Sequence, residues 1–281
     1  MIIPAHEILM KKMKGVCESE HSNWCTDFKL LEKSFNLIKD IKPGETAIRF
    51  GDGELVVIEG KVPNYPGRRT HHSPWLINKL FESARKTTFF GATYSATAFK
   101  RKHSHKLDKW RKRTINLLEQ KNIHPKFIFD ANIFTRRLDL LPHLIKDKNT
   151  LIITSKSPKL IQRLEDERFC NFFGLYPSGT SCIDIAGGTL FPHKMPPEKM
   201  YNYIFSEVEK IDKKSREKVE AVLVGAGGTA KPVVVDLVNH FPNAFIIDAS
   251  SLLGGYIGKR ERNPYTKDGI LSHIIKWKDH I

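Results

Sequence analysis

The chain has 281 residues, 40% of them hydrophobic and 27% charged, and its 46 Lys and Arg outnumber its 31 Asp and Glu to give a formal charge of +15. This composition excludes a low-complexity chain and supplies enough apolar side chains for a core that needs no disulfide support. The basic excess predicts attraction to phosphate groups, in a nucleic acid, in a nucleotide or at an anionic membrane surface.

Strands alternate with helices along the chain. Apolar spacing and proline or glycine boundaries predict helices over residues 27–41, 74–86, 105–121, 158–169, 196–215 and 231–241. Short apolar runs predict strands over residues 46–50, 87–92, 126–131, 150–156, 221–225 and 244–250, whereas 55–60 fits either a strand or a helix start and 170–195 reads mostly as loops with one short strand.

Such alternation is typical of an α/β, Rossmann-like fold with a mostly parallel sheet flanked by helices. We find no internal repeat and no linker, so we expect one domain over residues 1–281. Residues 1–26 form an N-terminal extension and 256–281 a C-terminal tail in this division. Ligands of such sheets gather at the carboxyl ends of strands, where two glycine-rich loops of this sequence are expected.

The first of these loops, in "TAIRFGDGELVVIEG", places Asp52 and Glu54 between glycines directly after a strand. If the backbone stays extended, side chains two positions apart point the same way, and the two carboxylates could hold one hard cation. Arg49 could pair with a phosphate or brace the loop through a carboxylate. The alternative is a Gly-Asp-Gly hairpin turn whose glutamate lies in solvent.

The second loop, in "VLVGAGGTAK", fits the dinucleotide-binding pattern Gly225-x-Gly227-x-x-Ala230, with Asp248 at the end of the next strand. Taken alone, it favours an NAD(P)-dependent dehydrogenase. Too little chain follows Gly225 for the two mononucleotide-binding halves of that fold. We therefore interpret the loop as a phosphate or nucleotide contact, with Thr229 and Lys231 as donors, or as a tight structural turn.

The run "RFGDGE" resembles the signature of the GT-D fold glycosyltransferases, whose Arg-Phe-Gly-Asp-Gly-Glu loop carries a metal-binding D-x-E motif. Residues 49–54 match it without a gap. "FIFDANIFTRR" is similar to a second family segment through Asp130 and Arg136. "VLVGAGGTAKPVVVDL" and "AFIIDAS" are similar to a third, with Gly228 in place of a proline. The resemblance is collinear over residues 45–250.

The resemblance implies a metal-dependent glycosyltransferase that moves a sugar from a nucleotide-sugar, a UDP-sugar, to a glycan, glycoprotein or lipid-linked acceptor. It implies Mn²⁺ or Mg²⁺ held by Asp52 and Glu54 as the cofactor. The residues expected at the nucleotide are Arg49, Gly51, Gly53, Gly227, Gly228, Thr229 and Lys231. Asp130 and Asp248, at strand ends, are candidates for a general base, and each could instead order a loop or cap a helix.

A basic stretch, "KRKHSHKLDKWRKR" at residues 100–113, interleaves Trp110 with Lys and Arg. It could bind a nucleic acid or the head groups of a lipid-linked acceptor, or it could be a solvent-exposed helix face that binds no ligand. A nucleic-acid-binding protein is a second alternative, but it leaves the D-x-E loop unexplained because carboxylates repel phosphate. Arg68 and Arg69 could close over a diphosphate or lie in a surface loop.

The four cysteines are scattered without a CxxC pair, so they predict neither a disulfide framework nor a zinc site. No apolar run reaches the roughly 18 residues of a membrane span, and the N-terminus lacks the apolar region of a secretory signal. We therefore expect a cytoplasmic protein whose basic surface can contact the inner face of the membrane.

Overall fold

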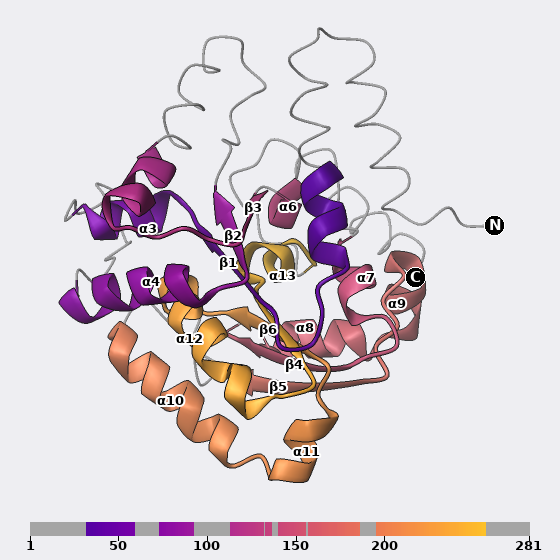
Figure 1. The fold of residues 1–281 in the computed structure, drawn as a ribbon. Coiled ribbons are helices and arrows are strands. Elements are labelled where there is room, and N and C mark those ends of the chain that lie inside the picture. Colours follow the sequence, from indigo (N-terminus) through magenta and orange to yellow (C-terminus); the bar gives the residue numbers. More distant parts are fainter. Residues whose placement is uncertain are drawn as a thin grey trace, which may run out of the picture.

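The structure is a computed structural model. It describes residues 32–59, 73–92, 113–131, 133–136, 140–155, 157–185 and 195–256 (Figure 1). The predicted extension 1–26, the loop with Arg68 and Arg69, the basic stretch up to residue 112 and the tail beyond Tyr256 lie outside these residues. The prediction of a single domain over the whole chain therefore stays a prediction.

Seven parallel strands form one sheet in the order β3-β2-β1-β7-β6-β4-β5. The strands are β1 (Thr46–Phe50), β2 (Phe89–Ala92), β3 (Phe127–Asp130), β4 (Asn149–Thr154), β5 (Gly179–Asp184), β6 (Ala221–Gly225) and β7 (Phe245–Asp248). β6 and β7, the last of these strands in sequence order, thus lie in the middle of the sheet. The predicted α/β fold with a parallel sheet is confirmed.

Helices cover both faces of the sheet (Figure 1). One face carries the helix at residues 32–39, α6 (Ile133–Arg136), α7 (Leu140–Ile145), α8 (Ser157–Leu164), α9 (Glu167–Phe173) and α13 (Ser250–Tyr256). The other carries α3 (Asp52–Ile58), α4 (Pro74–Lys86), the helix at 113–120, α10 (Pro197–Glu209) and α12 (Ala230–Asp236), while α11 (Lys213–Lys218) buries no residue. Nowhere in the described parts of the chain is a helix both long and apolar enough for a bilayer crossing.

A hydrophobic core lies on each face of the sheet, and the apolar runs that predicted the strands contribute side chains to both. In β6, Leu223 faces the first core and Val222 and Val224 face the second, because successive side chains of a strand point to opposite faces. A strand that is buried on both sides has no polar alternation, so it reads as an unbroken apolar run. This is why the central strands were recognisable in the sequence.

Several predicted elements differ from the structure. The helix expected over 158–169 is two helices, because Asp166 accepts hydrogen bonds from the amides of Arg168 and Phe169 and starts α9 afresh. The helix expected over 196–215 likewise ends at Glu209, and Asp212 caps a separate α11. Residues 52–58, ambiguous in the sequence, are helical. The short helices α6 and α7 were not predicted.

Candidate active site

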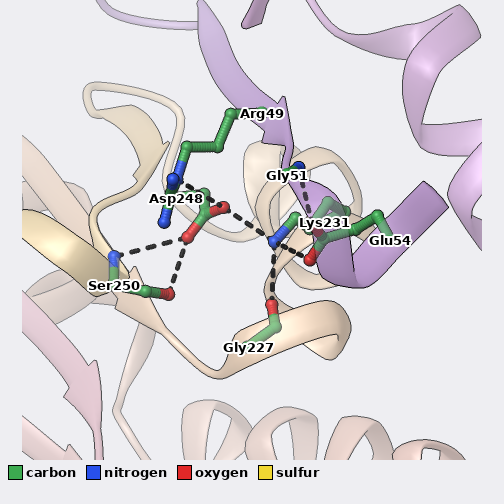
Figure 2. A network of polar contacts seen from close by, with 7 residues as sticks. All are labelled: Arg49, Gly51, Glu54, Gly227, Lys231, Asp248 and Ser250. Atoms are coloured by element: carbon green, nitrogen blue, oxygen red, sulfur yellow. Dashed lines mark hydrogen bonds and ion pairs between the residues drawn. The ribbon is translucent and has the colours of Figure 1, made fainter. Parts of the chain in front are cut away.

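The candidate site lies at the carboxyl ends of three neighbouring central strands, β1, β7 and β6 (Figure 2). Glu54 comes from the first turn of α3, which follows β1, and Lys231 comes from the first turn of α12, which follows β6 through a 3-10 turn, η3 (Gly227–Thr229). Asp248 is the last residue of β7, between the other two strands. In parallel sheets these ends meet at one edge, which brings together residues far apart in the sequence.

Lys231 is the centre of a buried polar network. Its Nζ lies 2.7 Å from Glu54 Oε1 and 2.9 Å from Asp248 Oδ2, and it donates a hydrogen bond of 3.0 Å to the carbonyl oxygen of Gly227. The Lys231 side chain is only 3% exposed. Two ion pairs and one hydrogen bond therefore hold the ammonium group in place.

Glu54 also fixes the start of its own helix. The amide of Gly51, the N-cap residue of α3, donates to Glu54 Oε2 at 2.7 Å. This is the glutamate half of a capping box, in which the third helical residue reaches back to the N-cap amide. One carboxylate oxygen therefore orders the loop after β1, and the other binds Lys231.

Asp248 is fully buried, and Ser250 holds its other carboxylate oxygen, Oδ1. Oδ1 accepts hydrogen bonds from the amide of Ser250 at 3.3 Å and from its hydroxyl at 2.8 Å, while Arg49 Nε lies 3.9 Å from Oδ2. Two cations, Arg49 and Lys231, thus approach the same carboxylate oxygen. Asp248 holds both of them at this edge of the sheet.

The charges of the network shift one another's pKa values. Burial alone would raise the pKa of Glu54 and of Asp248, but Lys231, followed by further hydrogen bonds and the charge of Arg49, holds both below their ordinary values. Burial would lower the pKa of Lys231, but Asp248 and Glu54 raise it above its ordinary value. All three groups are therefore ionised at neutral pH.

Gly227 shapes the loop that carries Lys231. Its φ is +58°, a left-handed conformation that favours glycine. Its carbonyl oxygen accepts the hydrogen bond from Lys231. Gly228, its neighbour, packs toward α4, since an added Cβ would lie 3.5 Å from Leu76. The predicted glycine turn is present, and it directs a carbonyl toward the lysine.

The structure brings most of the predicted site residues together, namely Arg49, Gly51, Glu54, Gly227, Lys231 and Asp248 (Figure 2). Thr229 follows in the same loop and is buried at 4% exposure. Gly53 is the second residue of α3, and a Cβ added there would meet no atom within 4 Å outside its chain neighbours and the backbone of its own helix.

Asp130 lies apart from this network. It ends β3, two strands away from β1, which is about 10 Å at ordinary strand spacing. Its amide donates to Ser34 Oγ at 2.8 Å, and the residue is 4% exposed. It lies at the same edge of the sheet as the network.

Asp52 is the first residue of α3, and its side chain lies outside the description. The expectation that Asp52 and Glu54 point the same way rested on an extended backbone, and the backbone there is helical. Side chains two positions apart on a helix project about 200° apart. The geometric premise was therefore wrong, and the metal assignment itself stays a prediction.

The part of the chain that is described holds no group of three or more His, Cys, Asp and Glu side chains suited to a metal ion. The atoms around Lys231 Nζ are nevertheless two carboxylate oxygens and one carbonyl oxygen, from Glu54, Asp248 and Gly227. These are the ligand types that Mg²⁺ and related hard cations take in proteins. The donor set fits a hard cation, and the ammonium group occupies its centre.

Two residues of the site were missed in the sequence. Ser250 binds Asp248, and "DAS" carries the signal, because an aspartate often accepts from the residue two positions on. Gly91 pairs with Arg49 across β1 and β2, and a Cβ there would come within 2.8 Å of Arg49 Cβ and 2.7 Å of the Phe129 ring. No local pattern predicts that approach.

The dehydrogenase alternative is not favoured. Both oxygens of Asp248, which would have to hold a ribose hydroxyl, are engaged by Lys231 and Ser250. The glycine loop belongs to a single βαβ unit from β6 through α12 to β7. The order β3-β2-β1 matches one mononucleotide-binding half, but the glycine loop follows β6 and not β1, the strand that carries it in the dinucleotide fold.

The comparisons with known proteins support the fold at a general level. No protein-family model matches the chain, and no curated protein matches it. A solved structure described as the highly conserved domain of unknown function 1792 with a distinct glycosyltransferase fold is 17% identical, covers 80% of this chain and 84% of that one, and superposes with a TM-score of 0.51. A selenomethionine structure of domain of unknown function 1792 is also 17% identical, with 78% and 76% of the two chains covered and a TM-score of 0.50. The chain therefore has a glycosyltransferase-like α/β fold.

Proposed function

We propose that the protein is a glycosyltransferase that moves a sugar from a nucleoside diphosphate sugar, a UDP-sugar, to a glycan, glycoprotein or lipid-linked acceptor. The observation that carries this proposal is the charged network of Arg49, Glu54, Lys231 and Asp248 at the carboxyl ends of the central strands. In open α/β sheets this edge is where nucleotides bind. The likeness to a glycosyltransferase fold agrees with it.

The residues suit the charge that develops in glycosyl transfer. Breaking the sugar–phosphate bond leaves a nucleoside diphosphate, whose growing negative charge must be stabilised by fixed positive groups. Arg49 and Lys231 would supply two such groups at the diphosphate. Asp248, buried and with a low pKa, is a weak base, so we assign it the positioning of these cations. Asp130 stays the predicted candidate for the base at the acceptor.

We propose Mn²⁺ or Mg²⁺ as the cofactor, with Glu54 and Asp52 as the residues that would hold it. Glu54 offers an oxygen at the centre of the network, and Asp52 begins the same helix. A divalent cation bound there would supply Lewis-acid stabilisation of the diphosphate. The protein's own part is to order the loop through the contact between Gly51 and Glu54 and to keep Arg49 beside it.

The first test combines ligand binding and transfer. Thermal unfolding is measured with UDP, GDP, CDP, NAD⁺ and NADP⁺, with and without Mn²⁺, because a ligand that binds only the folded state raises the melting temperature. We expect one nucleoside diphosphate to stabilise the protein in the presence of Mn²⁺. Its sugar nucleotide should then be hydrolysed or transferred, and Glu54→Gln should lower that rate about 100-fold.

Asp236→Asn is the matched control for Glu54→Gln. Asp236 is also ion-paired, to Lys86 at 2.9 Å and Lys79 at 3.7 Å, but it lies at the far end of α12. This variant should keep the nucleotide response of the wild type. A response to NAD⁺ or NADP⁺ alone, independent of metal, would instead restore the dehydrogenase alternative and refute the transferase.

A further inference from the structure

Lys231 fills a position that is built for a cation. Glu54 Oε1, Asp248 Oδ2 and the Gly227 carbonyl converge on its Nζ within 3.0 Å (Figure 2). The lysine side chain is 3% exposed and Asp248 is fully buried. The ammonium group therefore neutralises two carboxylates, one fully buried in Asp248 and one 12% exposed in Glu54, which is the task a bound metal ion would otherwise perform.

The four charged side chains of this network cancel one another. Arg49 and Lys231 are positive, and Glu54 and Asp248, with which they pair, are negative. A neutral set offers a diphosphate no net attraction. A further positive charge must enter, or a carboxylate must be masked, before an anionic donor binds here.

A divalent cation on Glu54 would have to share this carboxylate with Lys231. Its Oε2 is held by the Gly51 amide, and its Oε1 lies 2.7 Å from the ammonium group. A divalent cation on Oε1 would stand within a few ångströms of Lys231, where like charges in a partly desolvated site repel strongly. The lysine can yield because its charge lies at the end of a flexible four-carbon chain.

We infer that Lys231 and the divalent cation compete for Glu54, and that arrival of the cation releases the Lys231 ammonium group to bind the diphosphate of the donor. This inference rests on the proposed function and adds an order of events to it. Asp248 stays in place because Ser250 holds its other oxygen. The exchange turns a neutral edge into a positive one, so cation and nucleotide bind with positive coupling.

Mn²⁺ binding in the absence of nucleotide tests the competition. Binding is measured by electron paramagnetic resonance for the wild type, for Lys231→Met and for Lys79→Met. Lys79 also pairs with carboxylates, Glu82 at 3.0 Å and Asp236 at 3.7 Å, so its variant removes the same charge elsewhere. We expect Lys231→Met to bind Mn²⁺ about tenfold more tightly than the wild type, within the usual range of such coupling, and Lys79→Met to match the wild type.

The same variants test the second half of the exchange. Mn²⁺ should strengthen UDP binding to the wild type, and this strengthening should be smaller in Lys231→Met, because no lysine is released. Mn²⁺ binding that is equal or weaker in Lys231→Met than in the wild type overturns the inference.

A measurement on the wild type tests the exchange without relying on the Lys231→Met variant to fold correctly. An amine-acylating reagent labels the wild type, and peptide mass spectrometry follows the labelling rate of Lys231. Saturating Mn²⁺ should increase that rate, since the released amine is no longer enclosed, and UDP added with Mn²⁺ should lower it again. Lys213, whose side chain is 85% exposed, is the internal reference and should not change. An unchanged rate for Lys231 overturns the exchange.

The inference and the proposed function fail separately. If the wild type transfers sugar while neither it nor Lys231→Met binds Mn²⁺, the exchange is wrong and the transferase stands. If Lys231→Met binds Mn²⁺ more tightly while no sugar nucleotide is bound or transferred, the competition stands and the transferase is wrong.

Discussion

Gly227 has a left-handed backbone conformation, and its carbonyl oxygen binds Lys231 of the candidate site. Its φ of +58° costs nothing for glycine but about 1–2 kcal/mol for a residue with a Cβ. No atom lies within 4 Å of the position that its Cβ would take, so the strain is conformational and not steric. The effect of a substitution there can therefore be predicted without a packing term.

We expect Gly227→Ala to lower the free energy of unfolding by about 1–2 kcal/mol. Gly228→Ala is the control, because its Cβ would make an ordinary contact of 3.5 Å with Leu76 and its φ is not positive. Urea denaturation of the two variants measures the difference. Equal stabilities would show that the left-handed conformation of Gly227 is not maintained in solution.

A second prediction at this scale concerns Ser250. Its amide and hydroxyl both donate to the buried carboxylate of Asp248. Hydrogen bonds to charged groups contribute about 1.5–3 kcal/mol, so Ser250→Ala, which removes the hydroxyl alone, should cost an amount near the lower end of that range. Ser250→Thr keeps the hydroxyl and should recover most of it. A Ser250→Ala protein as stable as the wild type would contradict the role of this contact.

Local patterns in the sequence predicted most residues of the site, but not which of them contact one another. Glu54 and Lys231 were both predicted, because each lies in a glycine-rich loop after a recognisable strand. Their contact depends on β1 and β6 being separated by one strand only, β7. That arrangement is set by strand edges that are distant in the sequence, so the lysine was expected at a phosphate and was found on two carboxylates.

At the scale of elements, helix ends decided where the predictions failed. Residues 158–169 have the apolar spacing of one helix, yet Asp166 interrupts it by capping α9. A cap inside an apolar pattern is weak evidence in a sequence, because an aspartate in mid-helix can also point to solvent. By contrast, α4 was predicted with its observed bounds, since Ser73 and Pro74 mark its start and the residues after Lys86 enter a strand.

The Asp166 cap predicts a pH dependence of stability. Burial would raise the pKa of Asp166, but the hydrogen bond from Arg168 and the amide of Phe169 hold it below the ordinary value of 3.8. A carboxyl with a lowered folded pKa stabilises fully above its unfolded pKa, and that contribution is lost as the pH falls through the folded pKa. The wild type should therefore exceed Asp166→Ala in stability at neutral pH, and the difference should shrink below pH 3.8.

Thermal unfolding across that pH range, with Glu165→Ala as the control, checks this prediction. Glu165 is the exposed acidic neighbour, and its side chain does not cap α9. Its variant should follow the wild type at every pH. A constant difference between wild type and Asp166→Ala would mean that the charge of the cap is irrelevant.

At the scale of the whole molecule, the formal charge of +15 predicts that the protein is attracted to anionic surfaces. We propose that the protein binds anionic membrane surfaces and that this binding is electrostatic. Cosedimentation with phosphatidylserine vesicles should be strong at about 0.1 M salt and lost near 1 M, where the screening length falls from about 10 Å to about 3 Å. Phosphatidylcholine vesicles should not bind. Tight, sequence-independent binding to duplex DNA, with no nucleotide-sugar bound, would favour the nucleic-acid alternative instead.

The class of the fold followed from the sequence, but the order of its strands did not. Alternating strands and helices predict a parallel sheet because each crossover needs a helix. The position of β6 between β7 and β4 depends on which edges the crossovers reach, and several orders satisfy the same local pattern.

That strand order has a consequence for how the protein is made. Before β6 and β7 leave the ribosome, the earlier strands can pair only as two separate groups, β1 with β2 and β3, and β4 with β5. Each group then presents an unpaired edge, at β1 and at β4, of the kind that invites association with other chains. β6 and β7, which follow in the chain, pair with β4 and β1 and bring Lys231 and Asp248 to Glu54, so the pairing that covers these two edges also assembles the candidate site.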